Sequence, residues 1–153
     1  VSEALKEAIR CFRAELYMAS VVMLGKASEG VWIELGKSLI DSLPEPKRMK
    51  KAKDRSTLDN PIDGFGRKLK LIVNMVETGQ TEFSQLIKYA EVSLDEFRLA
   101  NQWSDLLRDT RNVVHYGNEP HLAHNHENVA TLLLSGSKHL KALLALQAAA
   151  GGK

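Results

Sequence analysis

Apolar positions recur at helical spacing along most of the chain. In the first forty residues they step by three and four, which places them on one stripe of a helix. The stripe predicts one long first helix with Ser2 as its N-cap. Gly25 interrupts it, which indicates either a kink or a close crossing with another helix. The stripe consists of Leu5, Ile9, Phe12, Leu16, Ala19 and Met23, and continues through Trp32, Leu35 and Leu39.

Two shorter helices are predicted in the middle of the chain. Asn60 and Pro61 form an N-cap followed by proline at the first helical position, and Gly79 closes that helix. A shorter helix is then expected from residue 81 or 82 to about residue 90. The apolar stripe of the first helix is Ile62, Phe65, Leu69, Ile72 and Val76, and that of the second is Phe83, Leu86 and Ile87.

Capping signals mark the start of the last two helices. Ser93 and Glu96 stand three residues apart, the spacing of a capping box, and Gly117 is expected to end the helix that they open. Asn125 is expected to cap the final helix. The apolar side of that helix is Val129, Leu132, Leu133, Leu140, Leu143 and Leu144.

About five helices with no convincing strand predict an all-α fold, an antiparallel helical bundle. The length suits a single domain, residues 1–150, and the small residues of 148–153 are expected to fray. A connecting loop is expected over 44–60, where the run 47–55 holds six basic side chains. We expect this run to be a solvated connection or a contact for a phosphate backbone.

Composition narrows the function classes only slightly. The net charge of +2 is too small to imply nucleic-acid binding unless the charges cluster locally. Cys11 is the single cysteine, so no disulfide forms within the chain, and we expect a buried thiol and a reducing, cytoplasmic location. No continuous apolar run approaches the roughly 20 residues of a membrane span.

One polar face stands out in the helix that begins near Ser93. Its members lie at i, i+3, i+4 and i+7 and therefore share one narrow arc: Arg108, Arg111, Asn112 and His115. The apolar residues of the same helix lie opposite: Leu99, Trp103, Leu106, Leu107, Val113 and Val114. We therefore expect two guanidinium groups, an amide and an imidazole to point outward together.

These side chains can support cleavage of RNA without a metal. Arginine binds phosphate oxygens bidentately and stays charged, while a histidine such as His115 transfers protons near neutral pH. The 2′-hydroxyl would attack the adjacent phosphate and leave a 2′,3′-cyclic phosphate and a 5′-hydroxyl. One helix face provides half of such a site, and two copies related by a two-fold axis would complete it.

The segment Leu-Leu-Arg-Asp-Thr-Arg-Asn-Val-Val-His resembles the Arg-x(4–6)-His signature of HEPN domains, which are small helical domains of prokaryotic defence and toxin systems. Arg108 and His115 match it with six residues between them, and Asp109 occupies the polar position after the arginine. The pair Arg111-Asn112 also resembles an Arg-Asn form of the motif, but His115 then arrives one residue early. Which arginine is catalytic stays open. Residues 7–29 also resemble the opening helix of some members.

The resemblance implies a homodimeric, metal-independent endoribonuclease without a cofactor, whose partners would be RNA and an antitoxin or regulatory protein. Arg108 and His115 would be catalytic. The residues expected to contact phosphate or RNA are Arg111, Asn112, Asp109, Tyr116, Lys50 and Lys51.

Two other readings are consistent with the same residues. Members of the family that have lost activity serve as interaction or dimerisation modules, and the basic face would then dock a partner protein or bind a nucleotide. In a purely structural interpretation, Arg108 and Arg111 are surface cations or pair with acids such as Glu15 or Glu29. A metal site is a weaker alternative, because the histidine spacing matches no strong motif. The histidines concerned are His115, His121, His124 and His126.

Overall fold

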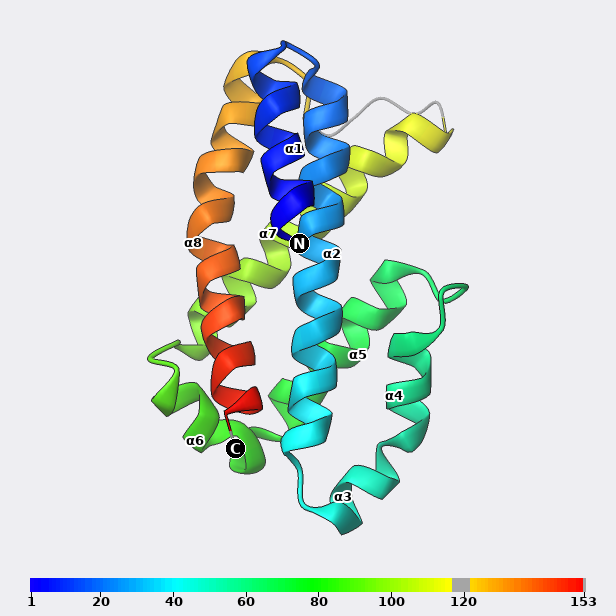
Figure 1. Ribbon diagram of the computed structural model, residues 1–153, viewed down its shortest axis with the longest axis vertical. Helices are drawn as coiled ribbons and strands as arrows, with labels where there is room; N and C mark the ends of the chain where they lie inside the picture. Colours follow the sequence, from blue (N-terminus) through cyan, green and yellow to red (C-terminus); the bar gives the residue numbers. More distant parts are fainter. Residues whose placement is uncertain (117–121, 153) are drawn as a thin grey trace.

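The computed structural model describes residues 1–116 and 122–152, except for the side chains of residues 80–82 and 113–116. Within this part the chain forms eight helices and no strand, so the all-helical prediction is confirmed and the expected number of about five is wrong (Figure 1). The helices are α1 (Ser2–Arg13), α2 (Tyr17–Ser42), α3 (Glu45–Lys50), α4 (Ala52–Asp59), α5 (Phe65–Thr78), α6 (Gln80–Tyr89), α7 (Leu94–Tyr116) and α8 (His126–Gly151).

The predicted first helix is in fact two helices. The chain leaves the helical conformation between α1 and α2, where Glu15 has a φ of +59° and Leu16 is exposed. The prediction is wrong because the apolar spacing continues across the turn and gives no sign of it. In the structure, α1 folds back on α2 and buries Ala4 and Ala8 against it. Ser2 is not the cap either, since α1 begins after Val1 without a side-chain capping bond.

Glycines on α2 and α8 permit close helix crossings rather than kinks. Helix α2 continues through Gly25, and a Cβ atom at that position would lie 3.6 Å from Cδ of Arg111 on α7. A Cβ at Gly36 would lie 2.7 Å from Ile72 on α5, and one at Gly136 would lie 2.5 Å from Trp103 on α7. The two tightest crossings therefore exclude any side chain at the point of contact.

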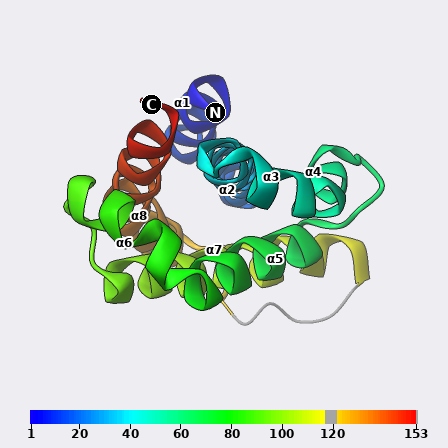
Figure 2. The ribbon, with the colours of Figure 1, turned by 90° about the horizontal axis from the view of Figure 1, so that it is seen from below.

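The core lies between two layers of helices. Figure 2 shows α1, α2 and α8 on one side and α5, α6 and α7 on the other. Trp32 of α2 is fully buried against Phe97 of α7, and its indole N–H donates a 2.8 Å hydrogen bond to Ser104. Ser104 also lies 2.9 Å from Ser28, so the polar atoms in this crossing have partners.

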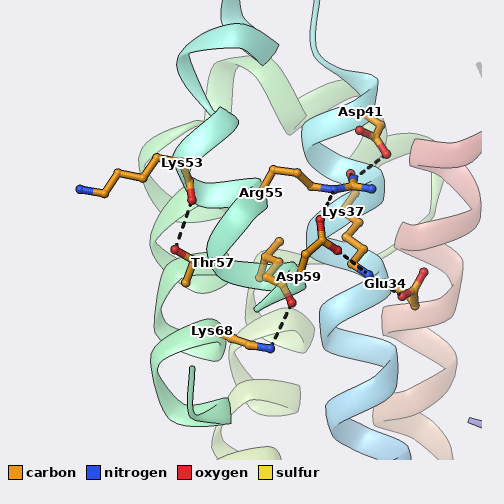
Figure 3. Close-up of polar contacts among 9 residues, drawn as sticks. Glu34, Lys37, Asp41, Lys53, Arg55, Thr57, Asp59 and Lys68 are labelled. Carbon is orange, nitrogen blue, oxygen red and sulfur yellow. Dashed lines mark hydrogen bonds and ion pairs between the residues drawn. The ribbon is translucent and has the colours of Figure 1, made fainter. Parts of the chain in front are cut away.

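The expected basic loop forms α3 and α4 instead, and ion pairs hold α4 against α2 (Figure 3). Lys37 pairs with Asp59 at 2.9 Å, and Arg55 pairs with Asp41 at 2.7 Å. The hydrogen bond from Lys37 lowers the pKa of the Asp59 carboxyl below its usual value. Leu58 is buried on the same side of α4. The ion pairs between α4 and α2, together with the buried Leu58, therefore favour a helix over a mobile connection.

The predicted start of the middle helix is also wrong. Asn60 accepts a 3.0 Å bond from the amide of Ile62 and so caps a turn, and α5 begins only at Phe65. Ile62 is consequently 90 % exposed instead of buried in the stripe. The predicted end at Gly79 is confirmed.

At the C-terminal half both caps are confirmed, because Ser93 and Glu96 bond each other's amides and Asn125 accepts from the amide of Asn128. Within the stretch expected to fray, 148–153, α8 continues to Gly151 and buries two alanines, Ala149 and Ala150. Leu99 and Leu144, which were expected in apolar stripes, are exposed, and Cys11 is only half-buried.

Helix α8 is long and apolar enough to match a membrane span by length and mean hydropathy alone. The search for a continuous apolar run of about 20 residues did not find this helix, because polar residues interrupt its apolar positions. The same composition is typical of a core helix, and α8 contributes Leu132, Leu140 and Leu143 to the core.

Candidate functional site

Arg108 is held by two carboxylates of its own helix. Its Nη1 lies 2.9 Å from Asp105, and its Nη2 lies 3.1 Å from Asp109. The guanidinium also packs on α5, where a Cβ at Gly66 would lie 2.8 Å from Nη1. Only 28 % of the side chain is exposed. Asp109, which was expected to contact RNA, is here a partner of Arg108.

Arg111 points to a different neighbour. Its Nη1 lies 3.3 Å from Glu29 on α2, and its side chain is 24 % exposed. The aliphatic stem passes Gly25 of the same helix. Glu29 is itself largely covered, so each charge of this pair depends on the other.

The predicted arc of α7 is therefore divided between two contacts. Arg108 faces α5, Arg111 faces α2, and Asn112 is half-buried. The backbone of α7 is helical through Tyr116, but the side chains of His115 and Tyr116 lie outside the described residues. Neither guanidinium group of the motif is free of carboxylates.

A small polar pocket lies beside Arg108, between α5 and α7. Its volume is about 230 Å³, and Lys70, Asn101 and Asp105 line it together with Arg108. Two cations and an amide in one pocket can accept a small anion, although Asp105 offsets part of that charge. Lys50 and Lys51 line a separate pocket that shares no residue with this one.

The histidines do not gather into a metal site in the described part of the chain, where no group of three suitable ligands is found. His126 packs its ring on Phe12 with 5.0 Å between the ring centroids. His124 has a buried Nε2 atom without a hydrogen-bond partner among the described residues. His121 lies outside the described residues.

A large apolar hollow, which the sequence pattern did not predict, is a groove between α1 and α8. We call it the α1–α8 groove. Its volume is about 550 Å³. Ile9 lies open on the α1 side, and Leu134 is 78 % exposed on the α8 side. The residues that form its walls are Leu5, Ile9, Phe12, His126, Ala130, Leu133, Leu134, Ser137, Leu140, Lys141 and Leu144.

A signal for this groove is present in the sequence. Helix α1 buries Ala4 and Ala8, yet it also carries Leu5, Ile9 and Phe12 on the adjacent side, so its apolar arc is wider than one contact requires. The three consecutive leucines at 132–134 likewise cannot all face one core. An apolar arc wider than the interface predicts a second contact.

The charges beside the groove are mainly positive. Lys141 lines it, and Lys6 and Arg13 flank Ile9 one turn away on the open side. Glu3 pairs with Lys6, whereas Arg13 and Lys141 form no ion pair within the described part of the chain. On α8, the acidic residue near the groove is Glu127, in the first turn of the helix.

Comparisons with protein families, curated proteins and solved structures found no match to this chain. The HEPN resemblance therefore depends on the sequence segments described above.

Proposed function

We propose that the chain is a binding module, a HEPN-like helical domain that docks an acidic amphipathic helix of a partner protein in the α1–α8 groove. The observation that carries the proposal is the apolar lining of the groove, which includes the highly exposed Leu134. An apolar groove that a folded domain leaves open is a place where the apolar face of a partner helix binds. The carboxylate partners of Arg108 and Arg111 support binding over catalysis, because both guanidinium groups already form ion pairs within the chain.

The shape of the groove favours a helix as its occupant. Phe12, near the end of α1, contacts His126 at the start of α8, so the two helices run side by side in opposite directions (Figure 1). Two such helices form a channel into which the apolar ridge of a third helix packs, with anchors at i, i+3, i+4 and i+7. Small side chains at Ala130 and Ser137 give that ridge room.

The charge of the groove favours an acidic partner over a second copy of the chain. A second copy would bring the unpaired Arg13 and Lys141 of each protomer toward a surface of the same sign. Glutamates beside the apolar ridge of a partner helix would instead pair with both cations. The partner class expected here is thus an amphipathic helix with acidic edges.

The test uses a designed helical peptide with a leucine ridge and flanking glutamates, and a control peptide with lysines in place of the glutamates. We expect the acidic peptide to bind at least tenfold more tightly in a fluorescence-anisotropy titration at low salt. Equal binding of both peptides would contradict the choice of partner.

Matched variants locate the binding surface. Leu134→Glu should remove peptide binding, whereas Ile62→Glu, an exposed apolar residue outside the groove, should leave it unchanged. Lys141→Glu should weaken binding of the acidic peptide and strengthen binding of the peptide with lysines. A further measurement is the oligomeric state of the chain without peptide, determined by sedimentation. A dimer that Leu134→Glu dissociates would show that a second copy fills the groove, against the proposal.

A HEPN-type ribonuclease is the second candidate, favoured by the pocket of Arg108 and Lys70 and by the way α7 extends past the bundle (Figure 1). RNA incubated with the protein in EDTA would then yield 2′,3′-cyclic phosphate ends, and both Arg108→Ala and His115→Ala would stop the reaction. Arg67→Ala, which removes an exposed arginine of α5, is the control. Cleavage that Arg108→Ala abolishes and Arg67→Ala spares would favour the nuclease over the binding module.

A further inference from the structure

A third hollow lies where the ends of α2, α5 and α6 meet α3. Its volume is about 350 Å³, within the range in which small ligands bind. Its floor is apolar and consists of Leu43, Met75 and Phe83, all of them largely buried. An apolar floor of this kind holds a carbon chain or a ring but offers nothing to a free ion.

One wall of the hollow is basic. Lys47, Lys50 and Lys51 line it from α3 and the residue that follows α3. Lys51 pairs with Asp54 at 2.9 Å and still exposes more than a third of its side chain, whereas Lys50 forms no ion pair within the described part of the chain. The wall therefore keeps a positive charge beside the apolar floor.

Local folding explains why lysines and apolar side chains meet here. Helix α2 ends at Ser42, and Pro44 turns the chain into α3. The basic run therefore lines the same hollow as Met75 and Thr78 in the last turn of α5. Gly79, between α5 and α6, leaves one side of the hollow without a side chain. The basic run is thus a wall of a pocket rather than a separate solvated loop.

We propose that this lysine pocket binds a small amphipathic anion, an organic phosphate or carboxylate attached to a compact apolar group. The anionic end would lie among the lysine ammonium groups and the apolar part on Met75 and Phe83. A polyanion that binds through charge alone would make no contact with the apolar floor. A neutral apolar molecule would make no ion pair with the lysines. This site shares no residue with the α1–α8 groove, so the inference goes beyond the proposed function.

Two sources of this chemistry are separated by the choice of probe. Octyl phosphate represents an alkyl phosphate, and adenosine monophosphate represents a phosphate on an aromatic ring. Inorganic phosphate is the control for charge alone. We expect one of the two organic phosphates to bind at least tenfold more tightly than inorganic phosphate in calorimetric titrations, and the tighter one identifies the source.

Methionine methyl groups report the place of binding. The chain contains four methionines, and Met75 is the one in the pocket floor. In NMR spectra of methyl-labelled protein we expect the Met75 signal to shift during the titration, while Met18 and Met23 at the far end of α2 stay in place. Shifts of Met18 and Met23 without a shift of Met75 would overturn the assignment.

A pair of lysine variants tests the wall. Lys50→Gln should weaken binding about two- to fivefold, as expected for one partly exposed charge pair. Lys53→Gln makes the same change of charge on α4 outside the pocket, where the side chain points away from α2, and should have no effect (Figure 3). Equal losses in both variants, or equal affinities for octyl phosphate, adenosine monophosphate and inorganic phosphate, would show attraction to the basic surface in general and refute the pocket.

Discussion

The arginine face of α7, formed by Arg108 and Arg111, and the α1–α8 groove differ in whether their side chains have partners within the chain. The arginine face carries the most conspicuous chemistry of the sequence, but its cations already have carboxylate partners on α7 and α2. The groove has ordinary residues, and no part of the chain that the structure describes covers its apolar surface. A binding surface is thus indicated by groups that lack partners in the fold, and a cluster of charge does not by itself supply such groups.

The largest expected effect concerns the crossing that holds α7 and α8 together. Gly136→Ala would place a Cβ 2.5 Å from the buried indole of Trp103. We expect a loss of about 1–3 kcal/mol of unfolding free energy in chemical denaturation, as for other overpacked cores. Gly25→Ala, at the contact with Arg111, meets an ordinary 3.6 Å contact and should be neutral or stabilise by up to about 1 kcal/mol through helix propensity. A destabilised Gly25→Ala would mean that the arginine face is as tightly packed as the core.

The second effect separates the two arginines. Glu29→Gln leaves the mostly covered Arg111 without its partner on another helix, and we expect a loss of about 1 kcal/mol. Asp109→Asn should cost less, because Arg108 keeps Asp105 and each of these pairs lies within one helix. Thermal denaturation of both variants at low and high salt measures this difference. A larger loss for Asp109→Asn would reverse the ranking of the two pairs.

The third prediction compares two leucines of α8, Leu132 and Leu134, which lie two residues apart. Leu134→Gln should change the unfolding free energy by no more than about 0.5 kcal/mol, because the side chain is exposed. Leu132→Gln, in the core two residues earlier, should destabilise the fold clearly more than Leu134→Gln, because its amide would lose water without gaining a hydrogen-bond partner. Denaturant titrations of the two variants test this. Similar losses would show that Leu134 stabilises the fold and does not serve as a free docking surface.

The smallest effect is a dependence on pH. Burial, with a contribution from Lys138, lowers the pKa of the His139 imidazole below its usual value. The unfolded chain therefore binds this proton more tightly, so the contribution to stability is complete above about pH 6.5 and falls as the solution becomes more acid. His139→Gln should flatten the curve of unfolding free energy against pH in this window. An unchanged curve would exclude this histidine as its source.

The sequence by itself determined the all-helical class and those helix ends that depend on a few neighbouring residues. The capping pair of Ser93 and Glu96, the cap at Asn125 and the stop at Gly79 are examples. Each is a local hydrogen-bonding pattern, and so residue types at fixed spacing predict it.

Only the tertiary structure decided where helical stripes divide and which faces are covered. The periodicity of α1 and α2 passes through Glu15 without a sign of the turn, because that turn depends on α1 packing back on α2. The partner of Arg111 lies 82 residues away on α2. Spacing along a helix fixes the direction of a side chain, but the distant segments that meet it are set by the packing of the whole chain.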